Sequence, residues 1–427
     1  MLKLNTKNTI DKPTKEQLEQ YSAKIKNIYQ GIDKQILPGS RDWMGWRTYP
    51  FDYPQAEFAR MVKKADEWKK DKVEYVVVIG IGGSFLGIKA AIDMCTNHLK
   101  EKLPKIIWVH NIGSNYLTSV LNQVEGKKFA IVVISKSGTT LEPAVSFRLF
   151  REKLEKQVGF EKASKYIVAV TDYDKGTLHD FAQKKKYSMF GIPNDIGGRF
   201  STLTPVGMFV IILAGLDYKA MLAGAQQAYK DTQSPDLKKN SAALYAVYRD
   251  FYYSQKKLAV ENFVVYDPYY SALGEQWKQI FGESEGKGGF GLYLGTSLFT
   301  TDLHSMGQFF QEGTRSFFET TLHVLQPKCD KKIVIKDDDD KLKFLNGKTI
   351  NEIDECAFLA TVSAHTKIGK TNNLVIELDN NDEFHYGYLF YWWSMTVTVN
   401  AYLFGVNPFN QPGVEAYKKE MFELLKK

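Results

Sequence analysis

Four short apolar runs, separated by helix-length segments, constrain the fold of this chain more than any other feature. The runs are Tyr75–Ile79, Ile106–His110, Ala130–Ile134 and Tyr166–Val170. Continuous runs rich in β-branched residues are typical of strands that are buried on both faces. Because these runs alternate with expected helices, such as Leu141–Lys156, the pattern predicts an α/β domain with a parallel, doubly wound sheet.

A second α/β region follows an apolar core helix that we expect over Pro205–Leu216. Its expected elements are a helix over Leu273–Phe281 and strands over Asn262–Tyr266, Thr321–Leu325, Lys332–Ile335 and Leu374–Leu378. The chain is therefore predicted to hold two related α/β units in tandem. The expected division is a helical segment over 1–50 that packs on the second domain, α/β domains over 51–215 and 216–405, and a C-terminal turn and helix over 406–427.

Length and composition exclude several classes of protein. The 427 residues suffice for two or three domains, and 44% hydrophobic with 25% charged residues is ordinary globular composition. The three cysteines, Cys95, Cys329 and Cys356, are far apart, which predicts neither a disulfide framework nor a zinc site and favours a reducing compartment. The net charge of +7 comes from scattered basic residues, so nucleic acid is not the expected partner.

Three segments bear on export, membranes and metals. Met1–Ile10 has no apolar core, so no secretory signal is predicted. Tyr386–Val406 carries no charge over 21 residues, which is about the length of a membrane span, but its aromatics and interspersed polar residues favour a buried core helix over that alternative. The acidic run Asp337–Asp340 lacks alternating oxygen ligands, so a solvated loop is expected rather than a calcium site.

The turn Ser135–Thr140 is the clearest candidate for a binding site. Its sequence, Ser-Lys-Ser-Gly-Thr-Thr, places four hydroxyls between a predicted strand and a predicted helix. The first N–H groups of a helix are unpaired and carry the positive end of its dipole, which attracts phosphate, and Gly138 permits a tight turn. The alternative is that these hydroxyls cap the helix, but one cap needs one hydroxyl. The turn therefore predicts a phosphate site.

A companion turn, Gly80–Gly87, follows the first predicted strand. It does not fit a dinucleotide fingerprint, because Phe85 stands where a glycine is needed and the next strand ends at His110 without a carboxylate for a ribose. A P-loop sequence is also missing. Two such turns at strand ends of one sheet are expected to converge on one small anionic ligand.

Four further residues are candidates for proton transfer. Arg199 follows a glycine pair and could stabilise an oxyanion, or it could be a surface arginine after a turn. Glu283, at the end of a predicted helix, could be a general base, although a solvated loop is the simpler interpretation. His304 has no second histidine three or four residues away, which argues against a metal ligand. Lys418 lies on a short last helix and could simply face solvent.

Taken together and in order, these segments resemble the glucose-6-phosphate isomerase (phosphoglucose isomerase) family in its shorter bacterial form. The resemblance runs from about Trp43 to the C-terminus. It rests on Gly80–Gly87, Ser135–Thr140, Gly197–Ser201, Gly282–Lys287, Thr301–Thr314 and Asn407–Lys418. The chain departs from the family pattern at Asn410, where an aspartate is usual, and at Trp392–Ser394, where an acidic residue is common.

The resemblance implies a fold, a reaction and a setting. It implies two sugar isomerase (SIS) domains, each an α/β/α sandwich, in a cytoplasmic homodimer with active sites at the subunit interface. The implied reaction is the reversible isomerisation of glucose 6-phosphate to fructose 6-phosphate in glycolysis and gluconeogenesis, by ring opening and a cis-enediol. Such proton transfer requires a base and an oxyanion stabiliser, so no cofactor and no metal are expected.

The same resemblance implies roles for individual residues. Glu283 would move the proton between carbons 1 and 2, and Arg199 would stabilise the enediolate. His304, which in this family reaches across the dimer, and Lys418 would help to open the sugar ring. The implied substrate-binding residues are Ser135, Ser137 and Thr140 for the phosphate, Lys136 beside them, and Gly83, Ser84, Gln279 and Gln411.

Two alternatives remain open from the sequence. A sugar-phosphate-binding regulator would use the phosphate turn without catalysis. A broader isomerase would also accept mannose 6-phosphate.

Overall fold

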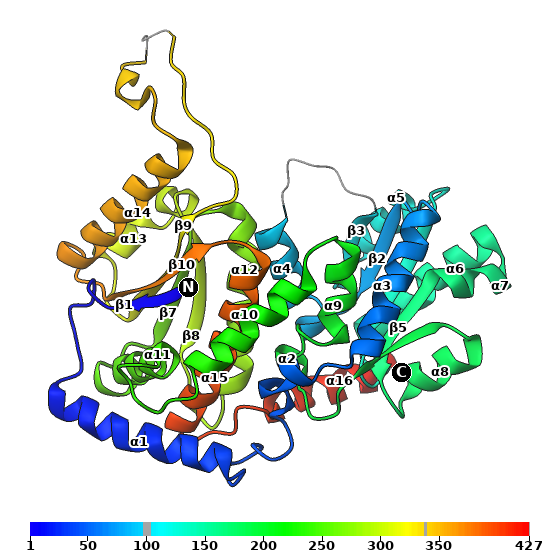
Figure 1. Cartoon of the computed structure of the whole chain (residues 1–427), viewed down its shortest axis with the longest axis horizontal. Helices are drawn as coiled ribbons and strands as arrows, with labels where there is room; N and C mark the ends of the chain where they lie inside the picture. Colours follow the sequence, from blue (N-terminus) through cyan, green and yellow to red (C-terminus); the bar gives the residue numbers. More distant parts are fainter. Residues whose placement is uncertain (97–103, 337–339, 427) are drawn as a thin grey trace. The chain divides into compact units, whose positions relative to one another are not determined.

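The computed structural model describes residues 1–96, 104–336 and 340–426. These residues form two compact units (Figure 1). The first unit is Gly39–Gln226, and the second unit joins Met1–Pro38 to Gln227–Lys427. Most of the acidic run Asp337–Asp340 lies outside the described residues, so its expected loop is not described.

The first unit is built on a five-stranded parallel sheet. Its strand order is β3-β2-β4-β5-β6, and Val77 of β2 lies opposite both Ile107 of β3 and Ile131 of β4. The strands are β2 (Tyr75–Ile79), β3 (Lys105–Val109), β4 (Phe129–Ile134), β5 (Ile167–Asp172) and β6 (Ser188–Ile192). All four strands expected here are present, and β6 is an additional strand that the sequence did not predict.

Helices cover both faces of this sheet. They are α2 (Tyr49–Asp52), α3 (Gln55–Lys70), α4 (Leu86–Cys95), α5 (Ser114–Gln123), α6 (Leu141–Val158), α7 (Phe160–Ala163), α8 (Thr177–Lys185), α9 (Pro205–Leu213) and α10 (Tyr218–Asp231), which continues into the second unit. Side chains of α5, α6 and α8 share one core with alternate residues of β2, β4 and β5. The connection from β2 to β3, which contains α4, runs toward the β3 edge of the sheet, whereas the connections through α5, α6 and α8 run toward the β6 edge. Because such connections are right-handed, α4 lies on the opposite face of the sheet from these three helices, and there it contacts α9.

The order of strands reverses at β2 and β4. Consecutive crossovers lead from β2 to β3 on one side, and from β4 through β5 to β6 on the other. Doubly wound sheets bind ligands at such a switch point, outside the carboxyl ends of the strands. The two turns singled out in the sequence, Gly80–Gly87 and Ser135–Thr140, begin at these two strand ends. The predicted doubly wound sheet is confirmed.

The second unit holds a sheet of the order β1-β10-β9-β7-β8. Four of its strands are parallel and in the same relative order as β2 to β5, while β1 is antiparallel at one edge. The strands are β1 (Leu2–Asn5), β7 (Val260–Val265), β8 (Tyr293–Leu298), β9 (Phe317–Gln326) and β10 (Asn373–Asn380).

Three expectations for the second unit need correction. The predicted strand Lys332–Ile335 is wrong, because in this segment Lys332 forms a single isolated bridge with Thr349 and no ladder follows. The first 50 residues were expected to be helix and loop, but Leu2–Asn5 alternates short apolar and polar residues and pairs with β10. The strand β8 was not expected, because Gly295 and its hydroxyl-bearing neighbours interrupt the apolar run.

The helices of the second unit are α1 (Lys15–Asp33), α11 (Ser241–Asp250), α12 (Ser271–Glu285), α13 (Gly307–Glu312), α14 (Ile350–Lys367), α15 (Glu383–Leu403) and α16 (Glu415–Leu425). The helix α15 is the predicted core helix: Trp392 and Trp393 are fully buried, and Trp392 stacks on Tyr245 of α11. Its Ser394 hydroxyl bonds back to the carbonyl of Phe390, which satisfies a polar group inside the core. Among the described residues, no helix has the length and apolarity needed to span a bilayer.

Candidate active site

The phosphate turn is held by its own hydroxyls and by the neighbouring strand. The Ser135 N–H donates to the carbonyl of Val170 at 3.0 Å, and Ser135 Oγ accepts from the N–H of Gly138 at 3.1 Å. The Ser137 and Thr139 hydroxyls lie 2.9 Å apart. Gly138 has a φ of +76°, and a Cβ there would clash with the backbone of Leu178. These contacts define the conformation of the turn without a ligand.

The start of α6 is open to an anion. In the described part of the chain, no side-chain hydrogen bond caps this helix at Thr140. The alternative that the hydroxyls serve as a helix cap is therefore not what the structure shows. Ser137, Thr139 and Thr140 are exposed, while Ser135 is buried. Exposed hydroxyls beside uncapped N–H groups provide the donors that a phosphate needs.

Arg199 is buried against the companion turn. It lies on the 3₁₀ turn η4 (Gly198–Phe200) and is 3% exposed, so the alternative of a surface arginine is wrong. Gly83, on the 3₁₀ turn η2 (Gly82–Ser84), lies so close to Gly198 that a Cβ on Gly83 would clash with its carbonyl oxygen. Phe200, next to the arginine, stacks on Trp46 at 5.4 Å. Backbone contact between η2 and η4 thus fixes where Arg199 lies.

Lys136 lies within the phosphate turn, but its ammonium group has other partners. The Nζ atom donates to the carbonyls of Pro193 and Asn194 at 3.1 and 3.0 Å, and it lies 5.4 Å from the centre of the Trp43 ring. Burial lowers the pKa of Lys136, against the opposing effect of Asp172 and Asp195. The backbone of Lys136 thus lies in the turn, while its ammonium group binds the loop after β6.

Glu283 lies at the last turn of α12 and is held by two amides. Gln279 Nε2 donates to Glu283 Oε1 at 3.2 Å, since residues four apart share a helix face. Gln411 Nε2 donates to Glu283 Oε2 at 2.9 Å from the turn that precedes α16. That turn is tied to the same helix end, because Lys287 Nζ donates to the carbonyl of Asn407. The structure therefore brings three of the predicted residues together.

A second carboxylate on the same helix end has a different environment. Glu285, two residues after Glu283, points to the buried side of α12 and pairs with Nη1 of Arg249 on α11. Arg249 Nε also pairs with Glu261 of β7 at 2.6 Å, and all three groups are essentially unexposed. Burial raises the pKa of Glu285 to about 7, and this outweighs the opposite effect of Arg249. One helix end thus carries one accessible carboxylate and one buried one.

His304 and Lys418 lie apart from this group. His304 is exposed on the 3₁₀ turn η7 (Thr301–His304), and its side chain makes no hydrogen bond or ion pair with any residue that the structure describes. Lys418 is partly exposed and pairs with Glu415 on the same helix at 3.1 Å, as the alternative of a solvated face implies, and its implied catalytic role stays a prediction. Neither residue takes part in the two hydrogen bonds described above for Glu283.

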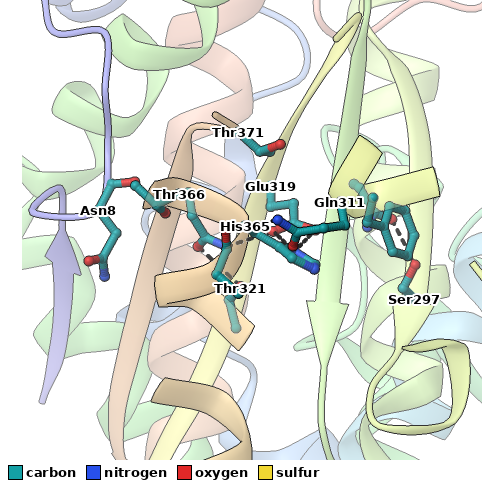
Figure 2. A network of polar contacts seen from close by, with 12 residues as sticks. Asn8, Ser297, Gln311, Glu319, Thr321, His365, Thr366 and Thr371 are labelled. Atoms are coloured by element: carbon teal, nitrogen blue, oxygen red, sulfur yellow. Dashed lines mark hydrogen bonds and ion pairs between the residues drawn. The ribbon is translucent and has the colours of Figure 1, made fainter. Parts of the chain in front are cut away.

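A buried polar network supports the segment that follows His304. Figure 2 shows Glu319 of β9 and His365 of α14 facing each other, with His365 Nδ1 3.0 Å from the carboxylate. Asn373 Nδ2 donates to the same carboxylate at 2.9 Å. Gln311 of α13 donates to the carbonyl of Ala364 at 3.3 Å. The helix after η7 is therefore joined to α14 by a hydrogen bond beside this network.

Sequence reasoning missed several residues that shape these sites. Trp43 and Trp46 lie beside Lys136 and Phe200, and no motif marked them beyond their being large aromatics. Arg249 is a charged residue within an apolar and aromatic stretch, and Glu285 lies in a glycine-rich, loop-like stretch, so no motif marked them as a buried pair. In the first unit, Gly83 lies against the turn that bears Arg199, and Ser135–Thr140 follows the strand next to the one that precedes Gly83. In the second unit, Gln279, Glu283 and Gln411 are joined by hydrogen bonds.

A doubly wound sheet with an uncapped helix start at its switch point is typical of proteins that bind small anionic ligands. Two solved structures share the fold over the whole chain. A hypothetical protein of Thermus thermophilus matches with a TM-score of 0.91 and 26% identity, covering 100% of both chains. A glucose-6-phosphate isomerase of Chlamydia trachomatis matches with a TM-score of 0.85 and 20% identity, covering 100% of this chain and 88% of that one.

Sequence comparisons define the family. The model of the family described as phosphoglucose isomerase matches residues 56–426. A curated glucose-6-phosphate isomerase of Mycoplasma mobile is 44% identical, over 100% of this chain and 99% of its own length. That of Clostridioides difficile is 47% identical, over 90% of this chain and 87% of its own length. The chain belongs to the phosphoglucose isomerase family.

Proposed function

We propose roles for the residues of this chain in the reaction of its family. The chain is an aldose–ketose isomerase that interconverts glucose 6-phosphate and fructose 6-phosphate. The reaction opens the sugar ring and moves a proton between carbons 1 and 2 through a cis-enediol. The observation that carries the assignment of roles is Glu283, a half-buried carboxylate aimed by two amide donors.

The first unit supplies anion binding in this proposal. The hydroxyls of Ser135, Ser137 and Thr140 and the open N–H groups of α6 bind the phosphate of the substrate. Gly83 and Ser84 line the sugar. Arg199 stabilises the negative oxygen of the enediolate, because a guanidinium stays charged and its burial leaves little water to compete.

The second unit supplies the base. A carboxylate has about four acceptor sites, and two amides on Glu283 leave others to accept a proton. Holding both oxygens fixes the direction from which the proton is taken, which lowers the entropic cost of reaching the transition state. Gln279 and Gln411 are thus both substrate-lining and orienting groups.

The test is the variant Glu283→Gln. It should fold and bind fructose 6-phosphate. Its turnover should fall by about a hundredfold to ten-thousandfold, which is the usual contribution of a general base. It should also lose the exchange of the carbon-2 proton of glucose 6-phosphate with heavy water. The matched control is Glu275→Gln, on the exposed side of the same helix, which should keep both activities. Proton exchange at wild-type rate in Glu283→Gln would refute the role of Glu283.

We further propose a homodimer in which His304 acts in the neighbouring subunit's site and Lys418 assists ring opening. Support comes from the exposed side chain of His304, which has no hydrogen bond or ion pair with the described residues, and from the exposed Met306 and Phe309 beside it. Equal mixing of His304→Ala and Glu283→Gln subunits should restore about a quarter of wild-type activity, because half the dimers would hold one intact site. If the mixture stays inactive although the dimers are shown to have exchanged subunits, the site is not shared between subunits.

The remaining proposals concern setting and domains. We place the chain in the cytoplasm, since three scattered cysteines suit a reducing compartment, and cell fractionation tests this. We keep 51–215 and 216–405 as the two SIS domains, with 1–50 and 406–427 attached to them. The proposed chemistry uses neither a cofactor nor a metal, so activity should survive dialysis against a chelator.

A further inference from the structure

The ammonium group of Lys136 joins two loops of the first unit. Its backbone belongs to the phosphate turn, where the Lys136 carbonyl accepts from Thr171 Oγ1 at 3.2 Å. Its Nζ donates to the carbonyls of Pro193 and Asn194, in the loop that follows β6. The side chain therefore spans from one strand end of the sheet to a loop two strands away.

That loop leads directly to Arg199. A short stretch of chain separates Asn194 from the arginine, and η4 begins within it at Gly198. The same loop is fixed at one more point, because the carbonyl of Asp195 accepts from the N–H of Gly45 at 3.3 Å. The lysine thus supplies a direct bond between the loop bearing Arg199 and the turn that binds phosphate.

The environment of Lys136 favours this bond over contact with a ligand. Two of the three ammonium donors are used on carbonyls, and the Trp43 ring lies beside the charge. Asp172 and Asp195 are close enough to attract the ammonium group, while Lys175 repels it. Turning the side chain toward a phosphate would break both hydrogen bonds to carbonyls, whereas the turn already offers hydroxyls and N–H groups.

We propose that Lys136 is a positioning residue, which fastens the loop 193–197 to the phosphate turn and so places Arg199 for the enediolate. The proposal rests on the function proposed above and goes beyond it. In this arrangement, the side chain of Lys136 connects the turn that binds the phosphate to the loop that bears Arg199. Loss of the lysine should weaken transition-state stabilisation more than phosphate binding.

The experiment compares Lys136→Met and Lys136→Arg with the wild type. The measurements are kcat, KM for fructose 6-phosphate, and the inhibition constant of inorganic phosphate. In Lys136→Met we expect kcat to fall by about tenfold to a hundredfold, which is the cost of a misplacement near 1 Å, while the phosphate constant changes less than about threefold. Lys136→Arg retains a cation of similar reach and should recover part of kcat.

Ser137→Ala is the matched control within the same turn, since its hydroxyl should affect phosphate binding first. It should weaken inhibition by phosphate more than it lowers kcat. Amide hydrogen exchange adds a readout that does not depend on activity: peptides covering 193–200 should exchange faster in Lys136→Met than in wild type. Should Lys136→Met not fold, Trp43→Leu weakens the same attachment and should shift kcat and exchange in the same direction.

Three results would overturn the proposal. One is weaker phosphate inhibition with unchanged kcat, which would make Lys136 a phosphate ligand. Another is no change in kcat, inhibition or exchange. The third is equal loss of kcat and phosphate binding with no recovery in Lys136→Arg. Failure of the proposed function is distinguishable, because it would appear as absence of isomerase turnover in the wild type itself.

Discussion

The buried carboxyl of Glu285 should make the second unit less stable as pH rises from weakly acidic to neutral. Its pKa in the folded state is about 7, against an ordinary value of 4.5, because it is buried on α12. Below pH 4.5 the carboxyl is protonated in both the folded and the unfolded state. Between 4.5 and 7 the unfolded chain releases this proton while the folded chain holds it, so the free energy of unfolding falls.

The size of the effect follows from the shift. At about 1.4 kcal/mol for each pKa unit, Glu285 should cost the folded state roughly 3 kcal/mol once the pH has passed 7. The variant Glu285→Gln carries an uncharged amide at every pH and should lose this dependence. Its stability relative to the wild type should therefore rise between about pH 5 and pH 8.

The assay must follow this helix rather than the whole chain, because two compact units can unfold in separate steps. Hydrogen exchange of peptides from α11 and α12, measured from about pH 5 to pH 8 and corrected for intrinsic rates, gives the local free energy of opening. The control is Glu275→Gln on the exposed side of α12, which should keep the wild-type dependence. If Glu285→Gln and wild type lose stability in parallel over this range, the reasoning is refuted.

Two other substitutions test the packing around the candidate site. Gly83→Ala should lower kcat by about tenfold or more with a smaller effect on folding, because its Cβ would push against Gly198 and displace Arg199. Steady-state kinetics and a thermal melt measure the two effects, and an unchanged kcat would contradict this prediction. Arg249→Met should destabilise the second unit by about 3–5 kcal/mol, because it leaves Glu261 and Glu285 buried without their partner. Hydrogen exchange of α11 measures the loss of stability. A loss below about 1 kcal/mol would show that the two ion pairs of Arg249 contribute little.

Strands with continuous apolar runs could be predicted from the sequence, and strands without them could not. The bounds of β2 match the predicted Tyr75–Ile79 because every residue there is apolar and both faces of the strand are covered. The strand β6 was missed because Ser188 and Gly191 lower its apolar content, although it pairs along its whole length with β5. Lys332–Ile335 has a strand-like composition, but no neighbouring strand pairs with it beyond one bridge in the described part of the chain.

The residue types of the site were easier to predict from the sequence than the hydrogen bonds that hold them in place. Hydroxyls before a helix indicated an anion site, and the structure leaves that helix start uncapped among the described residues. By contrast, Glu283 and Gln411 are 128 positions apart in sequence, so their hydrogen bond depends on the fold and no local pattern encodes it. The same applies to Lys136, because the resemblance that placed it beside the phosphate-binding residues gives no hint of its bonds to Pro193 and Asn194.

The edge strand β1 has a consequence for the order in which the chain acquires its structure. Leu2 pairs with Leu378, so β1 is made long before its partner β10, and the second sheet is incomplete until β10 has been made. The first unit, by contrast, is one continuous stretch whose parallel strands all lie between residues 75 and 192. During synthesis it can fold early and by itself, while Leu2–Asn5 remain unpaired until β10 has been made.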